Sequence, residues 1–390
     1  MCFCQKDSII LPVASLNGFT NQCFMKWIQT LLIFLFFPIA AISQQLTLIA
    51  PLPDEINETS GLIFLNQRII THNDSGGEPI LYELDSISGN ITRRVFISNA
   101  VNDDWEDICN DDEYIYIADI GNNRGSRTDL KVYRVSILDY FQTTNDTVSA
   151  EIIHFNYTDQ TDFTATSYST NFDAEAIISY NDSLYIFTKN WGNRKSNIYS
   201  LPKPIGTYQI HKIDSINTQG LVTGATYNPF SNCIMLLGYT YSEPFIIEIT
   251  NFNNNQFSSG IMNRQLLQMP NDYSFQTEGI TFINESQYYV TSEKSFSGSS
   301  GLFELDYQNT VNVGNREEKS TLIYPNPASN MIYIEYSNYA IAEIYDMQGR
   351  LLKTTTDTQI SILDLTQGVY LIIIKNSKGD QVCSRKIVIN

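Results

Sequence analysis

A short pattern recurs five times between residues 45 and 306, and it constrains the fold more than any other feature of the sequence. Each copy begins with a small or acidic polar residue that leads into an apolar strand; these residues are Ser60, Glu106, Glu175, Thr223 and Glu278. A turn, a second strand, a polar loop and a third strand follow, and four of the five copies add a fourth strand. Repeated units of four short antiparallel strands predict an all-β protein with a β-propeller at residues 44–308.

The fifth copy ends near Asp306 without a fourth strand. Residues 46–52, LTLIAPL, form an apolar segment before the first copy that has no partner of its own. We expect this segment to complete the last blade and close the ring, because closure removes exposed strand edges. The sequence therefore predicts five blades. Six blades are the alternative, with a degenerate blade hidden in residues 138–171.

The N-terminal region predicts export. Residues 25–43 contain a lysine, an apolar run and small residues before Gln44, which is the pattern of a secretory signal peptide. The run is short for a membrane span, so we expect no transmembrane anchor in the mature chain. Residues 1–24 resemble neither a signal nor a domain, and we interpret them as a misassigned start that precedes Met25.

A second pattern begins after a polar linker at residues 309–321. Alternating strands with a Gly-Arg turn and a Gly-Val-Tyr strand entry predict a small antiparallel β-sandwich at residues 322–390. The segments YPNPASN, IYDMQGRLL, LDLTQGVYLIII and KIVIN resemble the type A C-terminal sorting domain of the type IX secretion system of Bacteroidetes. The resemblance implies recognition by that secretion machinery, passage through the periplasm, and release or attachment at the outer-membrane surface.

The repeat region also resembles a known group. The segments WED, YIADIGNNR, DAEAI and QTEGITF are similar to those of an uncharacterised group of secreted bacterial β-propeller proteins. That resemblance implies the propeller fold, and it transfers no catalytic residue to this chain.

Charge and cysteine content narrow the classes of partner. The formal net charge of −18 argues against nucleic acid, which needs a basic surface. Outside the N-terminal segment the cysteines are Cys109, Cys233 and Cys383, which show neither disulfide nor metal-ligand spacing. We expect buried free thiols.

Polar residues at equivalent positions of the five copies should meet at one end of the central channel. The first strands start there and the second strands return there, so both sets face the same funnel-shaped mouth. The predicted ligand-binding residues of the funnel are Glu106, Glu175, Glu278, Asp119, Lys189, Arg124 and Glu293. We expect an acidic centre with a basic rim that includes Arg127, Arg194 and Lys294.

Carboxylates that crowd a narrow channel need a counter-charge. One solution is a hard cation such as Ca²⁺, for which Glu106, Glu175 and Glu278 are the candidate metal ligands. The second is ion pairing within the protein, most simply with Lys189. The third is a raised pKa on one glutamate, which prepares it for general acid–base catalysis.

The sequence gives little support for other kinds of catalytic site. A Ser-His-Asp hydrolase would have to use His72, and the Gly-x-Ser-x-Gly motif is absent. Two classes of function remain open, and the sequence does not decide whether the protein is an enzyme. The first is a secreted or cell-surface propeller that binds a ligand or cation in its funnel. The alternative is a calcium-dependent secreted hydrolase of an ester, phosphate or sugar substrate that uses the funnel carboxylates.

Overall fold

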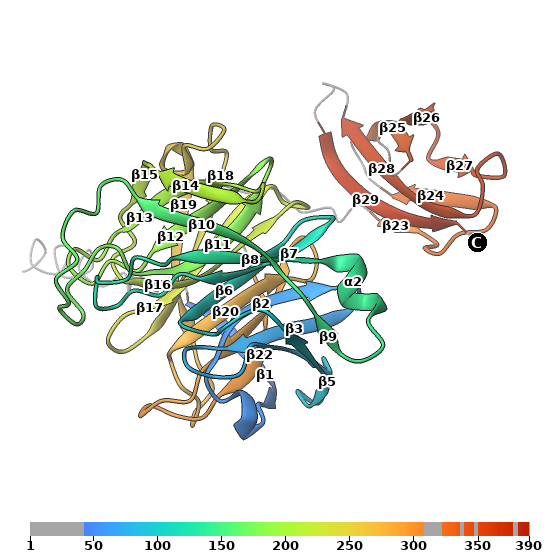
Figure 1. Cartoon of the computed structure of the whole chain (residues 1–390). Helices are drawn as coiled ribbons and strands as arrows, with labels where there is room; N and C mark the ends of the chain where they lie inside the picture. The colour runs from blue at the N-terminus through green and yellow to red at the C-terminus, as the bar shows by residue number, and fades with distance from the viewer. Residues whose placement is uncertain (1–42, 308–321, 336–338, 347–349, 377–380, 390) are drawn as a thin grey trace, which may run out of the picture. The chain divides into compact units, whose positions relative to one another are not determined.

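The computed structural model describes residues 43–307, 322–335, 339–346, 350–376 and 381–389 (Figure 1). The predicted start segment, all but the last residue of the predicted signal peptide, and the predicted linker lie outside these residues, so those three interpretations stay predictions. No helix in the described ranges is long and apolar enough to span a membrane.

Residues 43–307 form five antiparallel blades. Blade 1 contains β2 (Thr59–Leu65), β3 (Arg68–Asn73), β4 (Ile80–Leu84) and β5 (Ile91–Ile97). Blade 2 contains β6 (Trp105–Asn110), β7 (Tyr114–Asp119), β8 (Lys131–Ser136) and β10 (Glu151–Tyr157). Blade 3 contains β11 (Ala174–Tyr180), β12 (Ser183–Thr188), β13 (Ser196–Pro202) and β15 (Lys212–Ile216). Blade 4 contains β16 (Leu221–Asn228), β17 (Cys233–Tyr239), β18 (Pro244–Thr250) and β19 (Ile261–Gln268). Blade 5 contains β20 (Thr277–Phe282), β21 (Gln287–Ser292), β22 (Gly301–Asp306) and β1 (Ser43–Pro51).

The first strands of the blades form a closed inner ring. Each packs against the next in the order β2, β6, β11, β16 and β20, and β20 packs against β2. The prediction of a β-propeller is therefore confirmed with five blades. The six-blade alternative is wrong, because residues 137–157 form the helix α2 (Ile137–Gln142), the edge strand β9 (Thr147–Val148) and β10 of blade 2. The remaining short elements are the 3₁₀ turns η1 (Asp54–Ile56) and η2 (Phe257–Ser259).

The N-terminal strand closes the ring as expected. β1 pairs antiparallel with β22, with Leu46 opposite Leu305, and the two strands lie side by side in Figure 1. The first residues of β1 also run parallel to β19, with Ser43 opposite Leu266, which joins blades 4 and 5 in one sheet. Closure covers edges that would otherwise expose unpaired backbone groups.

One strand differs from the sequence prediction. The repeat pattern predicts the fourth strand of the third copy at residues 208–214, and the structure divides this segment between two blades. β14 (Gly206–Ile210) instead runs parallel to β10 on the edge of blade 2, and β15 completes blade 3. Each of the two strands buries an isoleucine in a different core. Ile210 of β14 is buried in the core that contains Phe155 of blade 2, and Ile216 of β15 is buried in the core that contains Phe245 of blade 4.

The thiol prediction is confirmed where the structure describes the side chains. Cys109 and Cys233 are buried and free. The side chain of Cys383 lies outside the described residues.

The C-terminal residues form a separate β-sandwich, which also confirms the prediction. One sheet contains β23 (Leu322–Tyr324), β24 (Met331–Glu335) and β27 (Gln359–Ser361). The other contains β25 (Tyr339–Tyr345), β26 (Leu351–Thr355), β28 (Gly368–Asn376) and β29 (Gln381–Ile389). Isoleucines from both sheets, such as Ile332 and Ile372, share one core.

Candidate functional site

The same irregularity occurs in all five inner strands. Each inner strand has a β-bulge against the second strand of its blade. The bulges contain the residues that the sequence register singled out, namely Ser60, Glu106, Glu175, Thr223 and Glu278. A bulge leaves a residue unpaired and re-aims its side chain. Four of these five residues, all except Thr223, line one pocket, whereas the Thr223 hydroxyl donates to the carbonyl of Thr277 at 2.6 Å.

The inner strands approach each other closely at glycines. A Cβ atom on Gly61 would lie 2.4 Å from the backbone nitrogen of Ile108 in the next blade. A Cβ atom on Gly224 would lie 2.2 Å from the carbonyl oxygen of Glu278. Any larger residue at these two positions would force the blades apart, so these glycines set the width of the ring.

A pocket of about 390 Å³ lies at this end of the channel. Five of the seven predicted site residues line it: Glu106, Glu175, Glu278, Lys189 and Glu293. The other lining residues are Ser60, Asp74, Asn123, Tyr168, Trp191, Tyr239 and Gln276. The predicted residues Asp119 and Arg124 do not line it, and the functional roles of all seven stay predictions.

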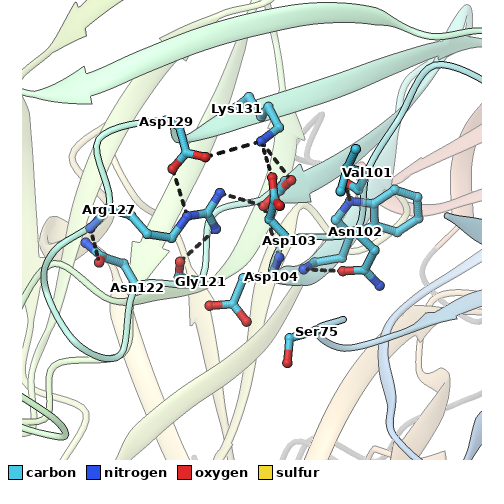
Figure 2. Close-up of polar contacts among 12 residues, drawn as sticks. Ser75, Val101, Asn102, Asp103, Asp104, Gly121, Asn122, Arg127, Asp129 and Lys131 are labelled. Atoms are coloured by element: carbon cyan, nitrogen blue, oxygen red, sulfur yellow. Dashed lines mark hydrogen bonds and ion pairs between the residues drawn. The ribbon is translucent and has the colours of Figure 1, made fainter. Parts of the chain in front are cut away.

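Asp119 is occupied elsewhere. Its carboxylate accepts a bond from Nη2 of Arg127 at 2.8 Å and lies 3.2 Å from Nζ of Lys131. Lys131 also contacts Asp103 at 2.7 Å, and Arg127 contacts Asp129 at 3.1 Å (Figure 2). The placement of Asp119 in the pocket is therefore corrected, because two cations from the following loop and strand neutralise it.

The predicted basic rim is also corrected. Arg124 is exposed, and its backbone carbonyl accepts a bond from the Thr166 amide at 3.0 Å. Arg194 donates to the hydroxyl of Tyr241, and Lys294 lies 3.8 Å from Asp54. None of these cations lines the pocket.

Lys189 is the cation of the pocket centre. Its ammonium donates to Oε2 of Glu175, and both side chains are buried. It also lies 5.2 Å from the ring centroid of Trp191 and 5.3 Å from that of Tyr239. Burial opposes its charge, but Glu175 and other anionic neighbours raise the pKa of Lys189 well above its ordinary value. Internal pairing therefore accounts for Glu175.

Glu106 and Glu278 are not accounted for in this way. They are 4% and 6% exposed, and within the described part of the chain neither carboxylate has a hydrogen-bond or ion-pair partner. Burial raises the pKa of both groups well above the ordinary value; Glu175 raises that of Glu106 further, whereas Lys189 partly offsets the rise at Glu278.

Two groups of carboxylates are close enough to share an ion. One is Asp74, Asp104 and Glu106, and the other is Glu106, Asp173 and Glu175; in each group one oxygen per residue lies within 4.8 Å of the others. Glu106 belongs to both groups. Glu278 belongs to neither group, and the role of Glu106, Glu175 and Glu278 as a trio of metal ligands stays a prediction.

Sequence reasoning missed Asp104 and Asp173, although a signal was present. Each precedes a bulge glutamate by two positions, in Asp104-x-Glu106 and Asp173-x-Glu175. Side chains two apart on a strand point to the same face, so the second carboxylate follows the first toward the channel. Gln276, which lines the pocket, stands in the same relation to Glu278.

Asp104 and Asp173 differ in the groups that surround their carboxylates. Burial, followed by repulsion from Asp74 and Asp173, raises the pKa of Asp104 to about 7. The pKa of Asp173 is also raised by burial, but its carboxylate accepts bonds from the Asn122 amide at 2.6 Å and from Nε1 of Trp191 at 2.7 Å.

The charge at the mouth does not balance. The carboxyl groups gathered there are Asp74, Asp104, Glu106, Asp173, Glu175, Glu278 and Glu293. Among the described residues, Lys189 is the one cation that lines the pocket, and Arg127 acts on Asp104 from outside it. Such a group must take up protons or a cation.

The fold and the pocket define an all-β protein of two kinds of domain, a five-bladed propeller with a buried acidic mouth and a C-terminal sandwich. Residues 322–390 match the family described as the secretion system C-terminal sorting domain, which belongs to type IX secretion. This segment implies interaction with that machinery and export to the cell surface or extracellular space.

One curated relative shares part of the chain. Over 70 residues the chain is 34% identical to β-agarase D of Zobellia galactanivorans. The match covers 17% of this chain and 14% of the agarase.

Several solved structures are distantly similar. A β-xylosidase/α-arabinofuranosidase of family GH43 from a compost metagenome is 11% identical, with a TM-score of 0.40, over 67% of this chain and 94% of its own. The PQQ-bound aldose sugar dehydrogenase of Streptomyces coelicolor is 10% identical, with a TM-score of 0.37, over 66% and 96%. At these values the similarities support no inference about activity.

Proposed function

We propose that this protein is an exported propeller whose central pocket binds a hard divalent cation such as Ca²⁺, with Glu106 as the shared ligand. The main support is that Glu106 is buried, has no polar partner in the described part of the chain, and belongs to both close carboxylate groups. The sorting domain supports the exported location.

The chemistry of the lining favours calcium over softer metals. The close groups contain carboxylates only, and no histidine or cysteine belongs to them. Ca²⁺ takes oxygen ligands at about 2.3–2.6 Å, so two of its ligands lie at most about 5 Å apart. The 4.8 Å limit within each group is compatible with that geometry. The ion would supply the positive charge that Lys189 alone does not.

Calorimetric titration of the metal-free full chain with CaCl₂ tests the proposal, together with a thermal melt in EDTA and in CaCl₂. Binding should raise the melting temperature, because the ion binds the folded state only. Glu106→Gln should weaken calcium binding on the order of tenfold or more, since it removes a charged ligand of the same shape. The same variant should raise the melting temperature in EDTA, because it replaces a buried carboxyl group that must either remain charged without a partner or take up a proton.

Glu113→Gln is the matched control, because Glu113 is exposed and lies outside the pocket. It should bind calcium as the unchanged chain does. Absence of any calcium response in the unchanged chain, or an unaltered response in Glu106→Gln, would overturn the proposal.

A second candidate is a calcium-dependent hydrolase, and Glu293 is the observation that favours it. Burial and the nearby Asp74 raise the pKa of Glu293 to about 7, which suits a general acid near neutral pH. Its carboxylate accepts a bond from Nε2 of Gln276 at 2.6 Å, and it belongs to neither cation group. Chromogenic esters, phosphates and glycosides test this activity. Turnover that Glu293→Gln abolishes while calcium binding persists would support it.

A further inference from the structure

Tyr168 gives the mouth of the pocket an open aromatic surface. Tyr168 lines the pocket together with Trp191, yet it is 64% exposed. Its backbone has a φ of 56°, a left-handed conformation that is uncommon for a bulky residue. Two bonds hold this backbone in place: its amide donates to the carbonyl of Asn123 at 3.0 Å, and Ser169 donates to the carbonyl of Thr166 at 3.2 Å.

Trp191 braces this surface. The rings of Tyr168 and Trp191 are 4.8 Å apart and nearly perpendicular, at 65°. Nε1 of Trp191 donates to Asp173, and its backbone amide donates to the carbonyl of Thr170 at 3.0 Å. Trp191 is therefore held by two hydrogen bonds, and the ring of Tyr168 packs against it, which lowers the entropic cost of binding.

The polar lining selects the chemistry of the occupant. The carboxylates of Glu106 and Glu278 can accept hydrogen bonds, while the amides of Asn123 and Gln276 can both donate and accept. An apolar ligand would leave the two carboxylates desolvated without partners. An anion would be repelled. An organic cation that stacks on the aromatic rings would compete with the ammonium of Lys189, which lies 5.2 Å from the ring centroid of Trp191 and 5.3 Å from that of Tyr239.

A hydroxyl-rich neutral ligand satisfies each of these conditions. We propose that the pocket mouth binds a neutral saccharide, with one sugar ring lying on Tyr168 and its hydroxyl groups reaching Glu106 and Glu278. The pocket volume of about 390 Å³ lies in the range of small-ligand sites. The saccharide site lies in the same pocket as the proposed cation site. It rests on the proposed function in one respect, which is that Glu106 contributes to both sites.

Affinity gel electrophoresis of the full chain tests the inference. The gels contain laminarin, xylan, galactomannan or agarose as neutral glycans, with polygalacturonate and chitosan as anionic and cationic references. At least one neutral glycan should retard the protein, and Tyr168→Ala should weaken that retardation on the order of tenfold. Tyr168→Phe should retain most of it, because the ring remains. Phe296→Ala is the matched control, since Phe296 is 91% exposed and does not line the pocket.

Retardation by no neutral glycan, retardation by chitosan alone, or equal retardation of Tyr168→Ala would overturn the inference. Calcium titration of Tyr168→Ala separates the two proposals. Calcium binding without glycan binding removes the saccharide proposal alone. The opposite outcome is a chain that binds no calcium but binds glycan in EDTA, with weaker glycan binding in Tyr168→Ala. That outcome removes the cation proposal alone.

Discussion

Glu106 and Asp107 are consecutive residues of β6, yet their carboxylates have different surroundings. Glu106 lines the pocket without a polar partner among the described residues. Asp107 accepts bonds from the backbone amides of Ile108 at 2.8 Å, Ile177 at 2.9 Å and Ala225 at 3.3 Å. These amides belong to blades 2, 3 and 4, so one buried side chain joins three inner strands beside the candidate site.

Asp107→Asn should destabilise the propeller, because an amide nitrogen replaces one of the accepting oxygens and faces a backbone donor. We expect a loss of about 1–3 kcal/mol in the free energy of unfolding, measured by urea denaturation. Asp112→Asn is the control, since Asp112 is exposed in the turn that follows β6. Equal stability of the two variants would contradict the assigned role.

Gly61→Ala should destabilise the ring, because its Cβ would meet the backbone of Asp107 and Ile108 at 2.4–2.7 Å. Overpacking against backbone costs about 1–3 kcal/mol or more. Gly77→Ala is the matched control, since the nearest atom to its Cβ would be the Asn102 side chain at 3.9 Å. A thermal melt should separate the two, and a Gly61→Ala protein as stable as the control would show that the blades are not in close contact there.

Stability without calcium should fall as the pH rises. The pKa values of Asp104 and Glu293 are raised to about 7 in the folded state, above their ordinary values of 3.8 and 4.5. The folded state therefore binds protons more tightly than the unfolded state, and this contribution to stability is full below about pH 4 and is lost as the pH passes 7. Melting temperatures in EDTA at pH 5, 6, 7 and 8 should decline across this series. CaCl₂ at pH 8 should restore them, and a flat profile in EDTA would contradict the assigned burial.

Lys189→Met should leave Glu175 buried without its partner. Breaking a buried ion pair costs about 3–5 kcal/mol, and we expect the larger loss at pH 8, where Glu175 cannot easily take up a proton. Lys195→Met is the control, because Lys195 is exposed in the same loop. The variant should also bind calcium more tightly, since a competing cation is gone. Weaker calcium binding in Lys189→Met would argue against a cation near Glu175.

Removal of residues 322–390 should block export, because this segment matches the sorting domain. We expect the shortened protein to accumulate in the periplasm, where immunoblots of cell fractions would detect it. A protein that carries Glu106→Gln with an intact sorting domain should still reach the surface or the medium. Normal delivery of the shortened protein would contradict the assignment.

Most of the propeller could be predicted from the strand pattern. The five starts from Ser60 to Glu278, and the closing role of residues 46–52, follow from local alternation and from the missing fourth strand. The exchange of β14 into blade 2 could not be predicted in this way. The alternation at Tyr208 and Ile210 fits the edge of blade 2 as well as the edge of blade 3. The choice of blade 2 depends on the free edge of β10, with which β14 pairs.

The equivalent positions of the site residues could be predicted from the sequence, but their ion pairs could not. The sequence placed Glu106, Glu175 and Glu278 at equivalent positions, and the bulges bring them to one pocket. It did not show that Asp119 would meet Arg127 and Lys131, because the path of the loop after β7 is not encoded in a local pattern. Asp104 could have been found, since a residue two positions before a channel residue shares its face.

Closure by β1 has a consequence for folding kinetics. Leu46 pairs with Leu305, so the contact that completes the ring joins opposite ends of the propeller sequence. Contacts of such high sequence separation form slowly, because a long loop must be closed before they stabilise the chain. A growing chain cannot finish the last blade until β22 has been synthesised. Until then the partner strands keep open edges, which are available for pairing with strands of other chains.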